Sequence, residues 1–144
     1  MHRLLGSAAI LWLGLAGCGG STGVPITGTV TFDGKALPGA MVSFRPTGQK
    51  TEGLGGSGLT GADGKFVLQE ARGGKGIAPG DYTVVINRRL RPDGSVPPAD
   101  LPPMDSDARE TLPVRYSDSK LSTLRATVSK DKPVHDFPLV TKSK

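Results

Sequence analysis

Apolar and polar residues alternate with a period of two along much of the chain after residue 24. In the first such segment Ile26, Val30 and Phe32 fall on one face, while the intervening threonines fall on the other. This spacing predicts a half-buried strand with β-branched residues outside. Asp33-Gly34 follows directly and is a strong signal for a two-residue hairpin turn.

The same alternation recurs in later segments that are bounded by turn residues. The further predicted strands span 40–44, 66–68, 82–86, 121–128 and 134–140. A polar, glycine-rich tract at 47–58 is predicted to be a loop. No segment has a sustained 3.6-residue pattern with helix caps. Short strands between turn signals therefore predict an all-β sandwich of about seven strands.

The first residues have the pattern of an export signal. Arg3 precedes an apolar run at 4–15, which is shorter than the roughly 20 residues of a membrane span. The run ends in Leu15-Ala16-Gly17-Cys18, and Cys18 is the only cysteine in the chain. The tetrapeptide resembles the bacterial lipoprotein lipobox at all four positions. The resemblance implies that the signal 1–17 is removed, that the Cys18 sulfur receives a diacylglycerol, and that the new amine is acylated.

This lipidation site predicts where the protein resides. Each buried methylene adds about 0.8 kcal/mol of membrane affinity, so several acyl chains on Cys18 anchor the protein to the cell envelope. The glycine-rich residues that follow, within 18–23, form a flexible tether. By resemblance to a known sorting rule, Gly19 in place of Asp favours the outer membrane. The alternative is an ordinary secretory signal with an incidental cysteine.

Three short motifs of turn and strand residues follow one another between residues 24 and 87. They are Gly28, Val30, Gly34, Leu37, Pro38, Gly39, Ala40 and Val42, then Thr60, Asp63, Gly64 and Phe66, then Pro79, Gly80 and Tyr82. The motifs resemble a carboxypeptidase-regulatory-like domain, and residues 112–128 resemble small bacterial lipoproteins of this type. The resemblance implies that residues 24–144 form a transthyretin-like (prealbumin-like) β-sandwich. These residues have structural roles, and Tyr82 is expected to bury its ring and to hydrogen-bond a loop backbone.

The segment 88–122 departs from a compact sandwich because it holds several prolines and acidic residues. It is too long for a hairpin loop, so we expect either an ordered excursion over a sheet edge or a partly mobile arm. Long loops on rigid scaffolds often carry function. The segment is therefore a candidate surface for capturing a peptide or glycan of the envelope, and a tolerated insertion is the alternative.

The charge pattern bears on possible partners. The formal net charge is +5, and the densest basic run is Arg88-Arg89-Leu90-Arg91. Nucleic-acid binding would need a stronger basic stripe with interleaved aromatic residues. The sequence therefore predicts no nucleic-acid partner, and it does not indicate an oligomeric state.

Few residues are candidates for catalysis or metal binding. His135 is the only histidine after the signal and is predicted to be exposed or at a sheet edge, whereas zinc needs three or four converging ligands. The Asp-Gly pairs at 63 and 93 lack the spaced oxygen ligands of a calcium loop and are predicted to be turns. We therefore expect no catalytic residue, no metal site and no cofactor.

Two further possibilities arise from single residues. By resemblance to related surface sandwiches, Lys35 and Asn87 are a candidate isopeptide pair, although Lys35 is on a turn and Asn87 is at a strand end. Sugar binding usually needs exposed aromatic rings. Trp12 leaves with the signal and Tyr82 is predicted to be buried, so only Tyr116 remains for that role.

Together these observations predict a lipid-anchored, non-catalytic lipoprotein of the cell envelope that acts as a structural or interaction module. The first alternative is an envelope binding subunit that captures a peptide or glycan partner through 88–122. The second is a cryptic hydrolase.

Overall fold

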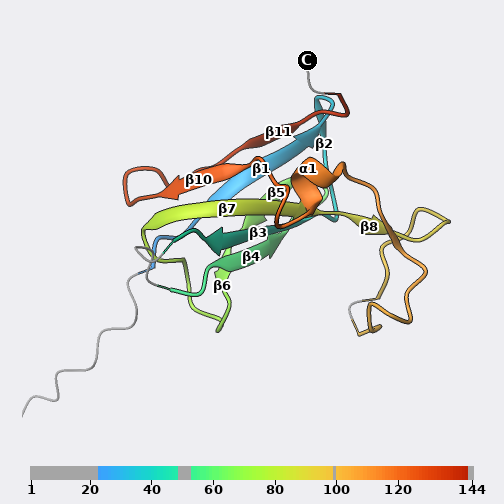
Figure 1. Cartoon of the computed structure of the whole chain (residues 1–144), viewed down its shortest axis with the longest axis horizontal. Coiled ribbons are helices and arrows are strands. Elements are labelled where there is room, and N and C mark those ends of the chain that lie inside the picture. Colours follow the sequence, from blue (N-terminus) through green and yellow to red (C-terminus); the bar gives the residue numbers. More distant parts are fainter. Residues whose placement is uncertain (1–22, 49–52, 99, 143–144) are drawn as a thin grey trace, which may run out of the picture.

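The computed structural model describes residues 23–48, 53–98 and 100–142, and nearly all of its elements are strands (Figure 1). The elements are β1 (Thr27–Phe32), β2 (Lys35–Ala36), β3 (Met41–Pro46), β4 (Gly56–Leu59), β5 (Lys65–Val67), β6 (Gln69–Glu70), β7 (Gly80–Asn87), β8 (Arg89–Leu90), β9 (Arg109–Glu110), α1 (Val114–Ser117), β10 (Arg125–Val128) and β11 (Phe137–Leu139). The all-β prediction is confirmed. The described residues form eleven strands rather than about seven, because several strands are only two residues long.

Two sheets enclose an apolar core in the manner of a β-sandwich. In one sheet β1 pairs with β11, β2 and β5, and the other has the order β10-β7-β3-β4-β6. Aromatic rings pack together in the core, both within the second sheet and across to the first. Phe44 of β3 lies 5.9 Å from the ring of Tyr82 and meets Phe137 of β11 edge-on at 6.0 Å. Phe137 and Leu139, from the segment predicted as a strand at 134–140, are buried in this core.

The chain passes from one sheet to the other at Leu68. β5 pairs with β1, whereas β6, one residue further on, pairs with β4 of the second sheet. Leu68 itself is buried, and its N–H donates to the Ile26 carbonyl at 2.9 Å. The residues 65–70 therefore act as a seam that closes one side of the sandwich.

The prediction of a loop at 47–58 is wrong for its last residues, which belong to β4. Residues 49–52 lie outside the described part. A Cβ at Gly56 would lie 2.4 Å from the Gln69 carbonyl oxygen, and one at Gly58 would lie 2.3 Å from that of Val67. The glycines therefore allow β4 to run close to the seam, a role that composition alone does not distinguish from that of a flexible linker.

The predicted turn at Asp33-Gly34 is confirmed. Phe32 pairs with Lys35, which leaves the two residues as the whole loop of the β1–β2 hairpin. Their φ angles of 49° and 82° are both positive, as a type I′ turn requires. Asp tolerates this left-handed conformation better than most residues, and Gly adopts it without steric cost.

The longest strand, β7, has the predicted inward face and one unpredicted buried residue. Tyr82, Val84 and Ile86 are buried, and the Tyr82 hydroxyl donates to the Ala78 carbonyl at 2.7 Å, as expected of a corner tyrosine. Val85 points the other way and is buried as well. The small helix α1 packs against β7, so this strand is covered beyond its core face.

The strand predicted at 121–128 is shorter in the structure and begins at Arg125. Leu121 is exposed, whereas the neighbouring Ser122 is buried and its hydroxyl donates to the Val84 carbonyl. This side-chain contact, rather than a strand ladder, joins residue 122 to β7. The strand predicted at 134–140 is likewise reduced to β11.

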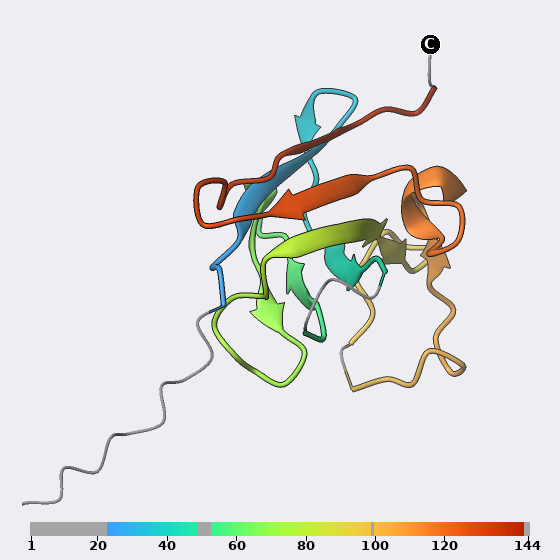
Figure 2. The same cartoon turned by 60° about the vertical axis from the view of Figure 1, so that its left-hand side comes forward.

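The described chain begins at one end of the sandwich, and the segment after β7 leaves from the other end (Figures 1 and 2). Val24 bridges Ile77, three residues before β7 starts. The eight residues of β7 then span about 26 Å along the body, at about 3.3 Å per residue. The segment that continues from Asn87 therefore emerges at the far end.

Candidate functional site

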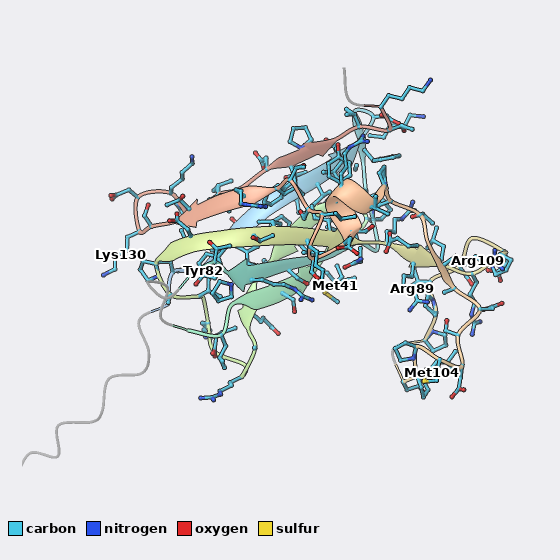
Figure 3. The ribbon with its side chains drawn as sticks, viewed as in Figure 1. Met41, Tyr82, Arg89, Met104, Arg109 and Lys130 are labelled. Carbon is cyan, nitrogen blue, oxygen red and sulfur yellow. The ribbon has the colours of Figure 1, made fainter. Side chains whose placement is uncertain are left out.

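We refer to residues 91–108, between β8 and β9, as the arm. It projects from the body at the end opposite to residue 23 (Figure 1), and Figure 3 places Met104 at its tip. The side chain of Met104 is 97% exposed. The predicted excursion at 88–122 thus consists of a two-stranded base formed by β8 and β9, this arm, and α1. Residue 99 of the arm is not described.

Glu110 organises the base of the arm. Its Oε1 accepts hydrogen bonds from the backbone N–H groups of Arg88 at 2.9 Å, Leu112 at 3.0 Å and Thr111 at 3.1 Å. Its Oε2 accepts from the Asn87 side-chain amide at 3.1 Å. One carboxylate therefore fixes the end of β7 against the start of β8 and the end of β9.

The basic run at 88–91 makes contacts within the protein. Arg88 Nε donates to the Pro38 carbonyl at 3.1 Å, Arg89 Nη2 donates to the Ala108 carbonyl at 2.8 Å, and Arg91 Nε lies 3.5 Å from Asp107 Oδ1. These contacts join the body to the base and the two sides of the arm to each other. Each arginine of the run therefore has a structural role at the base of the arm.

A hollow of about 530 Å³ lies at the base of the arm. It is lined by Leu90, Arg91, Pro92, Gly94, Arg109 and Thr111. Leu90 pairs directly with Arg109, which brings the guanidinium next to an apolar wall. The Arg109 side chain is exposed and makes no hydrogen bond or ion pair within the described residues, and the lining contains no carboxylate. The hollow is therefore our candidate binding site.

Arg109 lies within the segment 88–122, but nothing in the sequence distinguishes it from the other arginines there. An isolated arginine in a proline-rich tract has no distinguishing spacing. Its position in the hollow depends on the β8–β9 pairing, which joins residues 19 positions apart. The proline-rich composition was the only available signal for this region.

The helix α1 clamps the last described residues to the body. Arg115 Nη2 donates to the carbonyls of Val140 and Thr141, the latter at 3.0 Å. The Asp33 carboxylate accepts from the Thr141 backbone N–H at 2.9 Å and from its hydroxyl, and these bonds lower the pKa of Asp33. Tyr116 is only 7% exposed and packs on the core. It therefore offers no ring face to a sugar, contrary to the role left open for it.

His135 is predicted to be exposed or at a sheet edge. Exposure is wrong, although the residue does lie just before β11, an edge strand of the first sheet. Its ring is buried and meets Phe44 edge-on at 5.8 Å, and its Nε2 lies 3.1 Å from the Lys132 carbonyl oxygen. The ring is covered by a residue of the opposite sheet, which the local sequence does not reveal. Within the described part of the chain, no group of three or more His, Cys, Asp or Glu side chains could hold a metal ion.

Burial of His135 predicts a pH dependence of stability. Desolvation lowers its pKa below the usual value of about 6.5, so between the two pKa values the unfolded chain binds more protons than the folded one. The free energy of unfolding should therefore fall as the pH drops from 7.5 through 6.5 toward the folded-state pKa. Urea denaturation at several pH values between 5 and 8 measures this slope.

His135→Gln provides the matched variant for this measurement. Because glutamine does not titrate, its stability should change less over the same pH interval than that of the parent protein. An equal slope in both proteins would assign the pH dependence to other groups.

The remaining predicted site residues are not brought into a common site by the described structure. Lys35 is exposed on β2, whereas the Asn87 amide donates to Glu110 and, at 2.8 Å, to the Ser117 carbonyl. The Asp-Gly pairs at 63 and 93 are turns, each with its carboxylate bound to the backbone N–H two residues later. Cys18, the signal 1–17 and tether residues 18–22 lie outside the described residues.

Comparisons with known proteins do not assign the chain to a family. No protein-family model matches it, and neither a curated protein nor a solved structure is detectably similar. What the described residues define is a class of fold, an all-β protein with two facing sheets and a projecting arm. No helix among them is both long enough and apolar enough to cross a membrane.

Proposed function

We propose that this chain is a lipid-anchored, non-catalytic lipoprotein of the cell envelope, attached to the outer membrane through acyl chains on Cys18. The proposal rests first on Leu15-Ala16-Gly17-Cys18, which follows an apolar run of the length expected for a cleaved signal. Two or more acyl chains are enough for stable anchoring, whereas one gives only reversible binding.

The observation that carries the proposal is that the residues nearest to Cys18 and the arm lie at opposite ends of the body. Cys18 precedes Val24 by six residues, which can span at most about 20 Å. Val24 is at the end where β7 begins, and the arm leaves from the end where β7 finishes. A lipid on Cys18 would therefore keep the first end near the membrane and present the arm on the distal side.

We further propose that the sandwich belongs to the transthyretin-like, carboxypeptidase-regulatory-like type. Support comes from the roles of residues in the three sequence motifs. Gly34 and Gly64 adopt positive φ in turns, Tyr82 buries its ring, and Thr60 is a buried hydrogen-bonding residue. These roles are structural, in keeping with a non-catalytic module.

Mass spectrometry of the N-terminal peptide tests the anchor. The protein is expressed with its own signal in a bacterial host, and the mature peptide should begin at Cys18 and carry diacylglycerol and an amide-linked acyl chain. Cys18→Ser should lack this mass and leave the membrane fraction, with at least about a tenfold fall in membrane-to-soluble ratio, because the acyl anchor is lost.

Ser21→Ala is the matched control, since it alters the tether and leaves the lipobox unchanged. It should fractionate like the parent protein. A parent peptide without acyl mass, or a Cys18→Ser protein that stays with membranes after signal cleavage, would refute the lipid anchor.

A further inference from the structure

We infer that the hollow at the base of the arm binds a carboxylate side chain of an acidic peptide. This inference names a class of partner for the proposed envelope module. It rests on that proposal only for the location at which the protein would bind the partner. The binding chemistry itself depends on the hollow and would be the same in a protein without the lipid.

Arg109 supplies the group that would bind the carboxylate. Its side chain is exposed and lines the hollow, and no described residue accepts a hydrogen bond from its guanidinium. A guanidinium presents its N–H donors in a planar fork that matches both oxygens of a carboxylate. Arg109 is therefore available for a bidentate contact with an incoming ligand.

The carboxylates close to Arg109 in sequence, and that of Asp93 in the arm, make contacts with other groups. Glu110 accepts bonds from three backbone N–H groups and from Asn87. Asp107 lies 3.5 Å from Arg91 Nε, and Asp93 accepts from the backbone and hydroxyl of Ser95. Within the described residues none of these carboxylates forms an ion pair with the Arg109 guanidinium.

The rest of the lining favours a peptide over a glycan. Leu90 and Pro92 offer apolar surface for the methylene groups of a ligand. Gly94 has no side chain, and the space beside its Cα is unoccupied. Sugar sites usually contain an aromatic ring on which the sugar stacks. The hollow has none, and both tyrosines of the chain, Tyr82 and Tyr116, are buried in the core.

Fluorescence anisotropy with the full-length protein in detergent micelles tests the inference. The probe is a fluorescein-labelled hexapeptide of alternating glutamate and leucine, compared with versions that carry glutamine or lysine instead of glutamate. The glutamate peptide should bind at least about tenfold more tightly than the glutamine peptide, because charge-assisted bonds are the stronger ones. Its affinity should also fall with added salt.

Three variants assign the effect to the hollow. Arg109→Gln should weaken binding of the glutamate peptide about tenfold or more, and Arg109→Lys should be intermediate, because it keeps the charge but loses the fork. Arg72→Gln, an exposed arginine in the loop before β7 at the opposite end of the body, should bind like the parent protein. Thermal melts should show that all three variants are folded.

Equal binding of the glutamate and glutamine peptides, or unchanged binding by Arg109→Gln, would overturn the inference. So would displacement of the glutamate peptide by a neutral oligosaccharide, since that result would indicate a sugar site. Cys18→Ser separates the two proposals, because it should abolish the anchor and leave peptide binding unchanged.

Discussion

Gly28→Ala is expected to lower the free energy of unfolding by at least about 3 kcal/mol, which is at or beyond the usual cost of overpacking a core. A Cβ at this position would lie 1.8 Å from the His135 carbonyl oxygen and 2.9 Å from a ring carbon of Phe66. The oxygen belongs to backbone that is held by a hydrogen bond from His135 N–H to the Thr27 carbonyl at 2.9 Å. It cannot move away without loss of that bond, so the sheet itself must shift.

Gly34→Ala is the matched control for this prediction. Gly34 has a φ of +82°, and a Cβ at this position would have no atom within 4 Å, so alanine there meets only conformational strain, worth about 1–2 kcal/mol. Urea or guanidinium denaturation of both variants gives the comparison. A Gly28→Ala protein as stable as Gly34→Ala would contradict the prediction. It would mean that the close packing of β1 against residues 134–136 does not require glycine at position 28.

Thr60→Val is expected to cost about 2–4 kcal/mol although the two side chains have nearly the same shape. The buried Thr60 hydroxyl donates to the Leu37 carbonyl at 2.6 Å and accepts from the Ala40 N–H at 2.8 Å. Valine would leave both backbone groups buried without partners, and each such group costs about 1–3 kcal/mol. Equilibrium denaturation is again the measurement.

Thr60→Ser and Thr47→Val distinguish the lost hydroxyl from other effects of substitution. Serine keeps both hydrogen bonds and should retain most of the stability. Thr47 is on the surface and donates to the Asp81 carbonyl at 2.9 Å, so valine there should change the stability by about 1 kcal/mol or less. A Thr60→Val protein as stable as Thr47→Val would contradict the role assigned to the buried hydroxyl.

The parts of the fold that can be predicted from sequence are those with local causes. Asp33-Gly34 specifies its turn because both residues tolerate positive φ, and the alternation of β7 specifies which residues face the core. Tyr82 is predictable for the same reason, since its hydroxyl reaches a carbonyl only four residues away. In each case the interacting groups are close in sequence.

The errors arise where the cause is distant in sequence. His135 is buried because Phe44 covers it from the other sheet, and β4 is a strand because the seam at 65–70 approaches its glycines. For the candidate site, the prolines at 88–122 predict an excursion. The Glu110 network and the position of Arg109 beside Leu90 depend on a pairing that no spacing rule indicates.

The parallel pairing of β1 with β11 has a consequence for how the protein is made. The first strand of the body pairs with the last, and Thr29 N–H donates to the carboxylate of Asp136, 107 residues later. Closing a loop of that length carries an entropy cost on the order of 4 kcal/mol. The first sheet therefore cannot be completed until residues 137–139 have left the ribosome, and topologies of this kind fold slowly.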